Sequence, residues 1–523
     1  DALGARIAAI QKTNDPTTHA DEVLTGAKVL LFLLLCFTGA LGALSYFRNF
    51  EISFPWQLAA AMAYGHEMHV LGFLDDDDRL HGHVLNGQPI YAPQDFGDLV
   101  LNLGVTHVLL ALPTISRARR NEILNTLAPF KVAVRTLPSL NDLAQGKVNV
   151  SDLRELDIDD LLGREAVQPN AWLLNLNTQG KRVVVTGAGG SIGSELCRQL
   201  SRFEPACIVL LETSELALYM IEQWFGEHRP EVPIVRLAGD VKDESRMAQV
   251  FAEHRPQVVF HAAAYKHVPL MENNPYEAIK TNVIGTRILS ELASEVGVEK
   301  FVMVSTDKAV NPTNVMGATK RLAEMYTQSM NQIEGVKTKF IATRFGNVLG
   351  SNGSVIPLFK KQIERGGPVT VTHPEITRYF MTIPEACELV LEAATMGQGG
   401  EVFVFDMGES VKIIDLAKKM ITLSGLRVDK DIEIRYTGLR PGEKLYEELL
   451  NNDENTLPTH HPKILIAEVN TPSYAYMEVA TNDLNHLLSS GNNNSIVAKI
   501  KEIIPEYKSN NSVFETLDKK SSK

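Results

Sequence analysis

The sequence predicts an α/β protein whose main domain, residues 181–505, is a doubly wound Rossmann-type parallel sheet with a smaller C-terminal substrate-binding region. Two observations predict this fold. Apolar runs alternate with helical patterns along the domain, and a glycine-rich turn follows the first run. After about residue 350 the pattern becomes more mixed, as expected of a lid. The predicted strands are KRVVVT, CIVLL, PIVRL, QVVFHAAA, KFVMVST and TKFIATRF.

A second α/β domain is predicted over residues 57–140, followed by a polar connector at residues 141–180. Here too helical patterns alternate with apolar runs, which indicates a parallel sheet. The helices are QLAAAMAYGH and residues 116–127, and the strands are HVLGFLDDD, THVLLALP and FKVAVRTLP.

Residues 29–47 form an uncharged run, VLLFLLLCFTGALGALSYF, after a polar N-terminal segment at residues 1–28. The run has the length that crosses the ~30 Å hydrocarbon layer of a bilayer, so it predicts a transmembrane helix. The alternative is a buried helix of the first domain. The tail at residues 506–523 is rich in Ser, Asn and Lys and is predicted to be disordered.

The composition places the chain among globular proteins. Its 523 residues are 44% apolar and 22% charged. The net charge of −12 argues against nucleic-acid binding, which usually needs a basic stripe. The four cysteines form no CxxC pair, so neither a zinc site nor a disulfide framework is indicated, and no bound metal is expected.

The motif VVVTGAGGSIGSEL lies between an apolar strand and an amphipathic helix, the context of a dinucleotide-binding fingerprint. In this motif Gly187 permits the tight turn, Gly190 lets a pyrophosphate approach, and Gly193 lets the helix pack. Ser191 and Ile192 begin the helix, whose free amides bind the anion. The alternative is a plain glycine turn.

Further cofactor contacts are expected at the ends of the next strands. Glu212 lies 19 residues after Gly193, where a carboxylate accepts hydrogen bonds from ribose hydroxyls and repels a 2′-phosphate, which favours NAD over NADP. A capping or solvated glutamate is the alternative. His261 fits a packed core histidine better than a catalytic base. The other expected contacts are Asp240, Val241, Ala262, Ala263, Ala264, Lys266 and Asn282.

A candidate catalytic set follows the strand KFVMVS, beginning with Thr306, Asp307 and Lys308. Met316 and Lys320 come next, and a spacing of four puts both on one helix face. Extended short-chain dehydrogenases carry YxxxK at this place, with the tyrosine as the proton-transfer group. Because a thioether is neither an acid nor a base, another group must move the proton here.

Seven motifs occur in order over residues 186–450: TGAGGSIGSEL, AAYKHVPLMENNP, KTNVIGT, VSTDKAVNPTNVMGATKR, TRFGNVLGSNGSVIP, ITRYFMTIPEA and GLRPGEKLYEELL. With them the chain resembles the membrane-associated nucleotide-sugar 4,6-dehydratases of the capsular polysaccharide biosynthesis protein family, in the extended short-chain dehydrogenase/reductase superfamily. The resemblance implies a role in bacterial capsule, O-antigen or glycan synthesis. It also implies a homo-oligomer at the inner membrane, anchored by residues 29–47, with a cytoplasmic catalytic domain.

The resemblance also implies a reaction, the conversion of UDP-N-acetylglucosamine to a 4-keto-6-deoxy sugar. A hydride leaves C4 for NAD(P), water is lost across C5–C6, and the hydride returns at C6. Thr306 then binds the C4 oxygen, Asp307 protonates the leaving C6 hydroxyl and Lys308 takes the C5 proton. A lysine base requires a lowered pKa, which burial beside NAD and Lys320 is expected to provide. Lys320 holds the nicotinamide ribose.

The same resemblance implies the substrate ligands. Arginine suits bidentate contacts with phosphate. Lys266 and His267 are expected at the junction of cofactor and sugar. The residues expected to bind pyrophosphate, nucleotide, ribose or sugar are Arg344, Asn347, Arg378, Arg440 and Glu443.

The first domain departs from the family, because the stretch FRNFEISFPW carries no glycine fingerprint. That domain is therefore expected to bind no dinucleotide or to be poorly folded. Two enzyme alternatives remain, a UDP-hexose 4-epimerase, which Met316 disfavours, and a C5-inverting dehydratase. A non-catalytic membrane scaffold of polysaccharide assembly is the alternative from another class, and the intact Thr306, Asp307, Lys308 and Lys320 argue against it.

Overall fold

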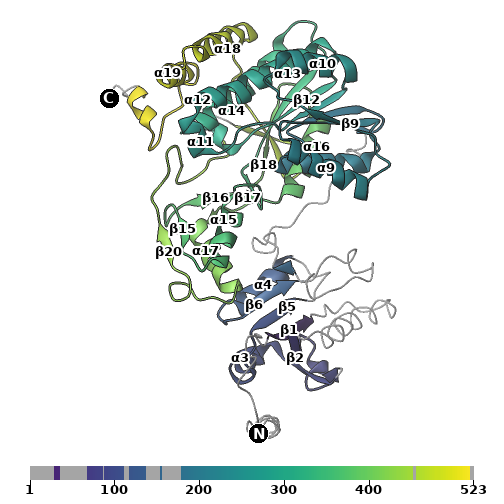
Figure 1. The fold of residues 1–523 in the computed structure, drawn as a ribbon, viewed down its shortest axis with the longest axis vertical. Helices are drawn as coiled ribbons and strands as arrows, with labels where there is room; N and C mark the ends of the chain where they lie inside the picture. The colour runs from purple at the N-terminus through teal and green to yellow at the C-terminus, as the bar shows by residue number, and fades with distance from the viewer. Residues whose placement is uncertain are drawn as a thin grey trace. The chain divides into compact units, whose positions relative to one another are not determined.

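The computed structural model describes residues 29–35, 68–85, 87–110, 117–136, 154–155, 178–450 and 455–518. The chain divides into two compact units, and the larger unit contains almost all described residues from 178 onward (Figure 1). The predicted N-terminal segment, the predicted helix QLAAAMAYGH and most of the predicted connector lie outside the described residues.

The smaller unit contains a sheet with the strand order β3–β4–β2–β1–β5–β6–β7. The inner strands are parallel, which confirms the parallel sheet predicted for the first domain. Two helices follow strands of this sheet in the sequence, α3 (Phe96–Leu103) and α4 (Arg117–Leu127). The strands are β1 (Val29–Leu35), β2 (Met68–Asp75), β3 (Val84–Leu85), β4 (Gln88–Tyr91), β5 (His107–Leu110), β6 (Ala133–Thr136) and β7 (Arg154–Glu155).

The transmembrane helix predicted for residues 29–47 is wrong for Val29–Leu35, which form strand β1. This strand lies in the middle of the sheet and pairs in parallel with β2 and β5. A central parallel strand is covered on both faces, so it reads as a continuous apolar run that periodicity cannot distinguish from a helix. The rest of the predicted segment lies outside the described residues. Among the described helices none combines the length and apolarity needed to span a membrane.

The larger unit is built on a nine-stranded sheet with the order β10–β9–β8–β11–β12–β13–β18–β22–β21. The first seven strands are parallel, and the order reverses from β8 to β11, which confirms the doubly wound Rossmann sheet. The last two strands add antiparallel pairs. The strands are β8 (Arg182–Thr186), β9 (Cys207–Glu212), β10 (Ile234–Ala238), β11 (Val258–His261), β12 (Lys300–Val304), β13 (Lys339–Arg344), β18 (Val402–Phe405), β21 (Thr456–Pro458) and β22 (Ile464–Ala467).

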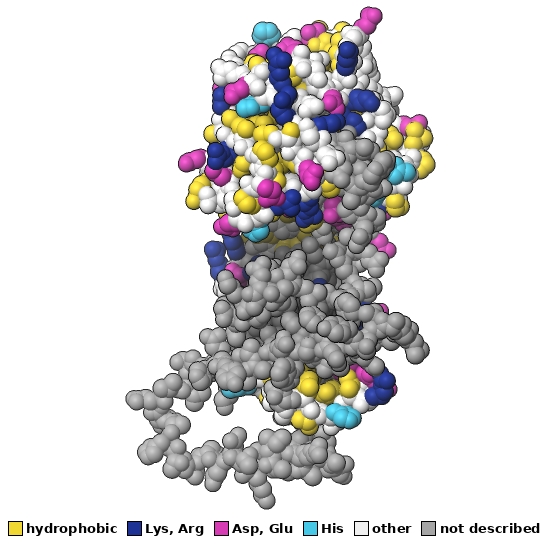
Figure 2. All heavy atoms as spheres, turned by 90° about the vertical axis from the view of Figure 1, so that its right-hand side faces the viewer, with side chains coloured by type: hydrophobic (Ala, Val, Ile, Leu, Met, Phe, Trp, Pro, Cys, Tyr) yellow, Lys and Arg dark blue, Asp and Glu magenta, His cyan; other side chains and the backbone are white. Residues whose placement is uncertain are grey.

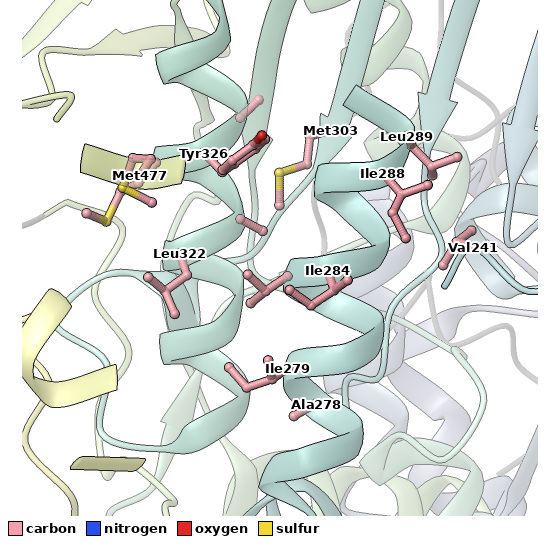
Figure 3. Close-up of a cluster of buried hydrophobic side chains, with 14 of the residues drawn as sticks. Val241, Ala278, Ile279, Ile284, Ile288, Leu289, Met303, Leu322, Tyr326 and Met477 are labelled. Carbon is pink, nitrogen blue, oxygen red and sulfur yellow. The ribbon is translucent and has the colours of Figure 1, made fainter. Parts of the chain in front are cut away.

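Helices cover both faces of this sheet. On one face α8 (Ser191–Leu200), α9 (Glu215–His228) and α16 (Ile383–Met396) bury an apolar core. On the other face a larger core surrounds side chains such as Ile284, Leu322 and Met477 (Figure 3). The helices of this second face are α10 (Glu244–His254), α11 (Val268–Asn273), α12 (Pro275–Ile279), the π-helical turn Lys280–Ile284, α13 (Gly285–Glu295), α14 (Val315–Ser329), α18 (Tyr474–Leu488) and α19 (Asn493–Ile503).

Helix α14 is buried along its whole length. One side packs on β13, and α11, α12, α13, α18 and α19 contact it from other directions. A helix enclosed in this way has a fixed position relative to the sheet, so the side chains near its N-terminus are held firmly.

A smaller region of mixed structure follows β13, as the sequence predicts. It contains short paired strands and two helices, α15 (Val355–Glu364) and α17 (Ile413–Leu423). The strand pairs are β14 (Asn347–Val348) with β17 (Phe380–Met381), β15 (Val369–Val371) with β20 (Ile434–Tyr436), and β16 (Thr377–Arg378) with β19 (Val411–Lys412).

The prediction of a disordered tail is wrong for residues 506–518. A 3-10 helix spans Val513–Leu517 and buries Phe514 in the larger core. The backbone before it pairs with the loop that leads into α14, because the amides of Lys508 and Asn510 donate to the carbonyls of Pro312 and Thr313. The polar composition is compatible with packing here because these polar groups have partners.

Figure 2 shows basic and acidic side chains interspersed on one face of the larger unit.

Candidate active site

The glycine-rich turn joins β8 to α8 at the point where the strand order reverses. Gly187 has a φ of +67°, and an added Cβ would lie 2.9 Å from the Ala263 backbone, so only glycine fits this position. A Cβ on Gly193 would lie 2.0 Å from the Gly187 carbonyl oxygen. At Gly190, the N-cap residue of α8, an added Cβ would meet only that same oxygen, at 3.2 Å. The turn therefore brings free amides of a ten-residue helix to an open edge.

A cleft of about 650 Å³ begins at this turn and continues into the smaller mixed region. Most of the predicted site residues line it. They are Gly187, Gly190, Ser191, Ile192, Gly193, Ala262, Ala264, Lys266, His267, Thr306, Lys308, Met316, Lys320, Asn347, Arg378, Arg440 and Glu443.

Glu212 ends strand β9 as predicted, and Asp240 lies two residues after the end of β10, but neither residue lines this cleft. Both oxygens of Glu212 are engaged by backbone amides: Oε2 accepts from Gly189, and Oε1 accepts from Thr213 and Ser214. Glu212 is not the N-cap of the following helix α9, which is Ser214, but it holds the backbone of the glycine-rich turn and of the segment that leads into α9. Asp240 Oδ1 accepts from the amide of the second residue after it, which closes a local turn. Contact of either carboxylate with a ribose or adenine stays a prediction.

Val241 and Asn282 also lie away from the cleft. Val241 is buried against Gly285. The Asn282 side chain is fully buried, and its polar groups form hydrogen bonds within the protein. Its amide nitrogen donates to the Tyr265 carbonyl and the Thr319 hydroxyl, and its oxygen accepts from the Tyr265 amide. The prediction that Asn282 contacts a cofactor is therefore wrong in this structure, and its role is to hold the cleft-lining Tyr265.

His261 is a core histidine, as expected. Its Nδ1 and Nε2 lie 2.8 and 2.9 Å from the hydroxyls of Thr186 and Thr286. Burial, helped by Lys320, lowers the pKa of His261 to about 3, so the ring is neutral.

Met316 and Lys320 lie on the cleft side of α14, as their spacing predicts. Lys320 Nζ donates to the Val304 carbonyl at 2.7 Å. Burial lowers the pKa of Lys320 to about 8, although Glu324 opposes the shift. This lysine is therefore ready to lose its proton in mildly basic solution.

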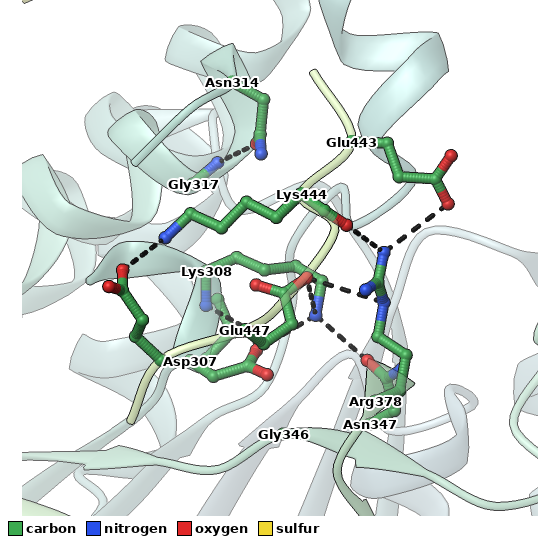
Figure 4. Close-up of polar contacts among 12 residues, drawn as sticks. Asp307, Lys308, Asn314, Gly317, Gly346, Asn347, Arg378, Glu443, Lys444 and Glu447 are labelled. Carbon is green, nitrogen blue, oxygen red and sulfur yellow. Dashed lines mark hydrogen bonds and ion pairs between the residues drawn. The ribbon is translucent and has the colours of Figure 1, made fainter. Parts of the chain in front are cut away.

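Thr306, Asp307 and Lys308 form one hydrogen-bonded group just after β12. Figure 4 shows Asp307 and Lys308. Asp307 Oδ1 accepts from the Thr306 hydroxyl at 2.8 Å and from Lys308 Nζ at 3.0 Å. Lys308 Nζ also donates to Asn347 Oδ1 at 2.9 Å. Asp307 is completely buried behind Gly346, whereas Thr306 and Lys308 reach the cleft wall.

The lowered pKa predicted for Lys308 is wrong. Burial does act to lower the pKa, but the carboxylates of Asp307 and Glu447 more than offset it, so the pKa of Lys308 lies above its ordinary value. Lys308 is held as an ammonium ion, which donates protons and does not accept them. The sequence predicted burial correctly but did not reveal the second carboxylate.

Arg344 is not on the cleft, and its predicted role as a nucleotide ligand is wrong. It ends β13 with its side chain 1% exposed. There it donates to both oxygens of Glu324 on α14, with Nε–Oε1 at 2.9 Å and Nη2–Oε2 at 2.8 Å. The bidentate contact that suits arginine for phosphate is made with a buried carboxylate instead.

Arg378, Arg440 and Glu443 come together at the far end of the cleft. Arg378 donates to the Lys444 carbonyl at 2.9 Å, and its guanidinium lies 3.5 Å from Glu443 Oε1. Glu443 Oε1 also accepts from Arg440 at 3.3 Å. The Arg440 side chain is 58% exposed, so it is open to a ligand, whereas Arg378 is buried and held on several sides.

Glu447 is the residue at this site that sequence reasoning missed. Its side chain is 2% exposed, and Oε1 lies 3.5 Å from Lys308 Nζ and 3.6 Å from Arg378 Nε. Burial raises the pKa of Glu447; Lys308 and Arg378 oppose the rise, and Asp307 adds to it. The only sequence signal was its place within GLRPGEKLYEELL, where two adjacent glutamates left open which one points inward.

Comparison with known proteins gives several matches to this chain. A family model described as "Polysaccharide biosynthesis protein" matches residues 183–469. Capsular polysaccharide biosynthesis protein CapD of Staphylococcus aureus is 53% identical over 365 residues, 69% of this chain and 60% of that protein. UDP-N-acetylglucosamine 4,6-dehydratase (inverting) of Campylobacter jejuni is 35% identical over 281 residues, 53% of this chain and 79% of that protein. The chain thus spans less than two thirds of the length of the staphylococcal relative.

Among solved structures, Pen from Bacillus thuringiensis is similar with a TM-score of 0.52 and 34% sequence identity. The match covers 56% of this chain and 89% of that chain, so the two proteins share a fold over that part.

Proposed function

The chain belongs to the polysaccharide biosynthesis protein family, and from this we propose that it is a nucleotide-sugar 4,6-dehydratase of bacterial polysaccharide synthesis. The proposed substrate is UDP-N-acetylglucosamine, the compound in the name of the Campylobacter relative. The observation that carries the proposal is the cleft wall itself, where Thr306 and Lys308 lie with Met316 and Lys320. This set offers a proton donor and a hydroxyl ligand without the tyrosine of a simple dehydrogenase.

NAD is the proposed cofactor. The turn fits a dinucleotide, because Gly187 and Gly193 leave no room for side chains and Gly190 keeps the helix amides open to the cleft. When bound at this turn, NAD would supply the hydride acceptor for sugar C4 and the hydride donor for C6. Lys320 would hold the nicotinamide ribose, and the small side chains Ala262 and Ala264 line the adjoining wall.

The residues that follow β12, Thr306, Asp307 and Lys308, carry out the remaining steps of the proposed reaction. The Thr306 hydroxyl binds the C4 oxygen of the sugar. Lys308, an ammonium ion on the cleft wall, gives a proton to the leaving C6 hydroxyl, and Asp307 behind it stabilises that charge. This proposal differs in two roles from what the family resemblance implies. Lys308 is not the C5 base, because a protonated amine has no lone pair to accept a proton, and Asp307 is not the direct acid, because it is fully buried and does not line the cleft.

Arg440 and Glu443 are the proposed ligands of the nucleotide, since they lie together and Arg440 is exposed. Arg378 would bind the sugar or a phosphate from its buried position. The expected homo-oligomer, inner-membrane location and cytoplasmic catalytic domain stay predictions.

The proposal is tested by incubating the chain with NAD and UDP-N-acetylglucosamine and following the sugar by NMR. A 4-keto-6-deoxy product is expected. A C4 epimer would instead identify a 4-epimerase, and failure of a panel of UDP-sugars to give any 4-keto product would contradict the dehydratase. The configuration at C5 in the same spectra distinguishes retention from inversion, the second candidate, which the name of the Campylobacter relative favours.

A further inference from the structure

Glu447 occupies a segment without regular secondary structure that passes beside the end of β12. The side chain points toward Lys308 and Arg378, as Figure 4 shows. It lines the same cleft as Thr306 and Lys308. A carboxylate buried this deeply is rare unless its charge is paired.

The two oxygens of Glu447 have different surroundings. Oε1 faces the cations of Lys308 and Arg378. Oε2 is buried and accepts no hydrogen bond from any residue that the structure describes. A buried oxygen in this state is unfavourable until a proton or a ligand satisfies it. Oε2 is therefore suited to a group that arrives with the substrate.

The neighbouring groups are less suited to accept a proton. Asp307 Oδ2, like Glu447 Oε2, is buried and has no hydrogen-bond partner among the described residues, but Asp307 lies behind Gly346 and does not line the cleft. Its Oδ1 already accepts two hydrogen bonds. Lys308 is kept protonated by the carboxylates on either side. Burial raises the pKa of Glu447, although Lys308 and Arg378 oppose the rise, so this carboxylate is a stronger base than an exposed glutamate.

We propose that Glu447 is a catalytic residue, the base that takes the C5 proton in the dehydratase reaction proposed above. The Glu447 carboxylate accepts the C5 proton, the C5–H electron pair forms the C5–C6 double bond, and the C6–O bond breaks. Lys308 gives the departing oxygen its proton, so water leaves. Glu447 later returns its proton to C5 as the hydride returns to C6. The C4 hydroxyl gives its proton to solvent during C4 oxidation, and Lys308 regains a proton from solvent after water has left, so protons balance over the cycle.

The test compares Glu447→Gln with the wild-type chain and with Glu448→Gln. Glu448 is the adjacent glutamate; it pairs with Lys444 and is 46% exposed, so it is a matched control outside the proposed chemistry. UDP-N-acetylglucosamine binding is measured by calorimetry, and the sugar from a single turnover is quenched and analysed by mass spectrometry. Glu447→Gln should bind the substrate and produce a 4-keto sugar that keeps its C6 oxygen. Its overall turnover should fall ~10²–10⁴-fold.

Glu448→Gln should behave like the wild-type chain. Glu447→Asp, which keeps the carboxylate, should recover part of the water loss. Turnover by Glu447→Gln within about threefold of wild type, far short of a general-base effect, would overturn the proposal. The proposal would also be overturned if Glu447→Gln no longer bound the substrate, or if it could neither oxidise C4 nor eliminate water. A glutamate with a purely structural role would give that pattern. If the wild-type chain itself gives no 4-keto product, the proposed function and this inference both fail.

Discussion

Arg344 and Glu324 form a bidentate ion pair between β13 and α14, and both side chains are inaccessible to solvent. Arg344→Met should therefore destabilise the fold by about 3–5 kcal/mol, since it leaves the Glu324 carboxylate buried without its main cation. Denaturant unfolding measures this change. The double variant Arg344→Met, Glu324→Met should recover much of the loss, because both charges are then removed.

The same variant tests the placement of Arg344. If Arg344 were a nucleotide ligand, Arg344→Met would weaken UDP-sugar binding at temperatures where the chain remains folded. We expect binding by the folded fraction to be unchanged, measured by calorimetry well below the melting temperature.

Gly190→Val should abolish NAD binding without unfolding the chain. An added Cβ at this position meets only the Gly187 carbonyl oxygen within the protein, so a branched side chain would occupy the space over the α8 amides. Titration with NAD, followed by fluorescence, measures the loss, and a melting curve checks the fold. Normal NAD affinity in this variant would remove the cofactor from the turn.

The tail beyond residue 505 should stabilise the larger unit. Phe514 is 3% exposed in the core, so Phe514→Ala should lower the free energy of unfolding by about 3–5 kcal/mol. Val513→Ala is a control because Val513 is 78% exposed, and it should change stability by less than about 0.5 kcal/mol. Equal effects of the two substitutions would show that the tail is not packed in solution.

Local sequence patterns predicted the strands and helices of the larger unit well, because each of these elements is specified by residues that are adjacent in the chain. A strand, a glycine turn and a helix are adjacent in the chain, so the Gly187–Gly193 turn was predictable from spacing alone. The direction of a single side chain is not local: Arg344 ends a predicted strand, yet whether it faces the cleft or α14 depends on Glu324, 20 residues away. Glu447 has no periodic neighbours from which burial could be inferred.

The prediction of a membrane helix was wrong at Val29–Leu35 for a different reason. A central parallel strand and a membrane helix both require continuous apolar residues, and only the partners β2 and β5 distinguish them.

Lys320 should make stability depend on pH in a defined direction. The pKa of Lys320 is about 8 in the folded state and 10.5 for an unperturbed lysine, so the folded state binds this proton less tightly than the unfolded state. The resulting destabilisation is complete below about pH 8 and is relieved as the pH rises toward 10.5. The stability of Lys320→Met relative to wild type should therefore be greatest near neutral pH and should decline above pH 8, measured by denaturant unfolding at several pH values. A difference independent of pH would contradict the burial of this ammonium.

Lys308 should set the acid limb of the pH–rate profile through Glu447. The Lys308 ammonium lies 3.5 Å from Glu447 Oε1 and lowers the pKa of that carboxyl, in opposition to burial. Lys308→Met removes the positive charge, so the pKa of Glu447 should rise further and its active, ionised form should be reached only at higher pH. The acid limb of turnover should therefore move to higher pH, and the maximal rate should fall ~10²–10⁴-fold because a proton donor is also lost. Lys308→Arg keeps the charge beside both carboxylates, so its acid limb should stay close to that of wild type even where its rate is reduced. Steady-state rates across the pH range distinguish these outcomes, and an acid limb that does not move in Lys308→Met would mean that the ionisation controlling the rate belongs to another group.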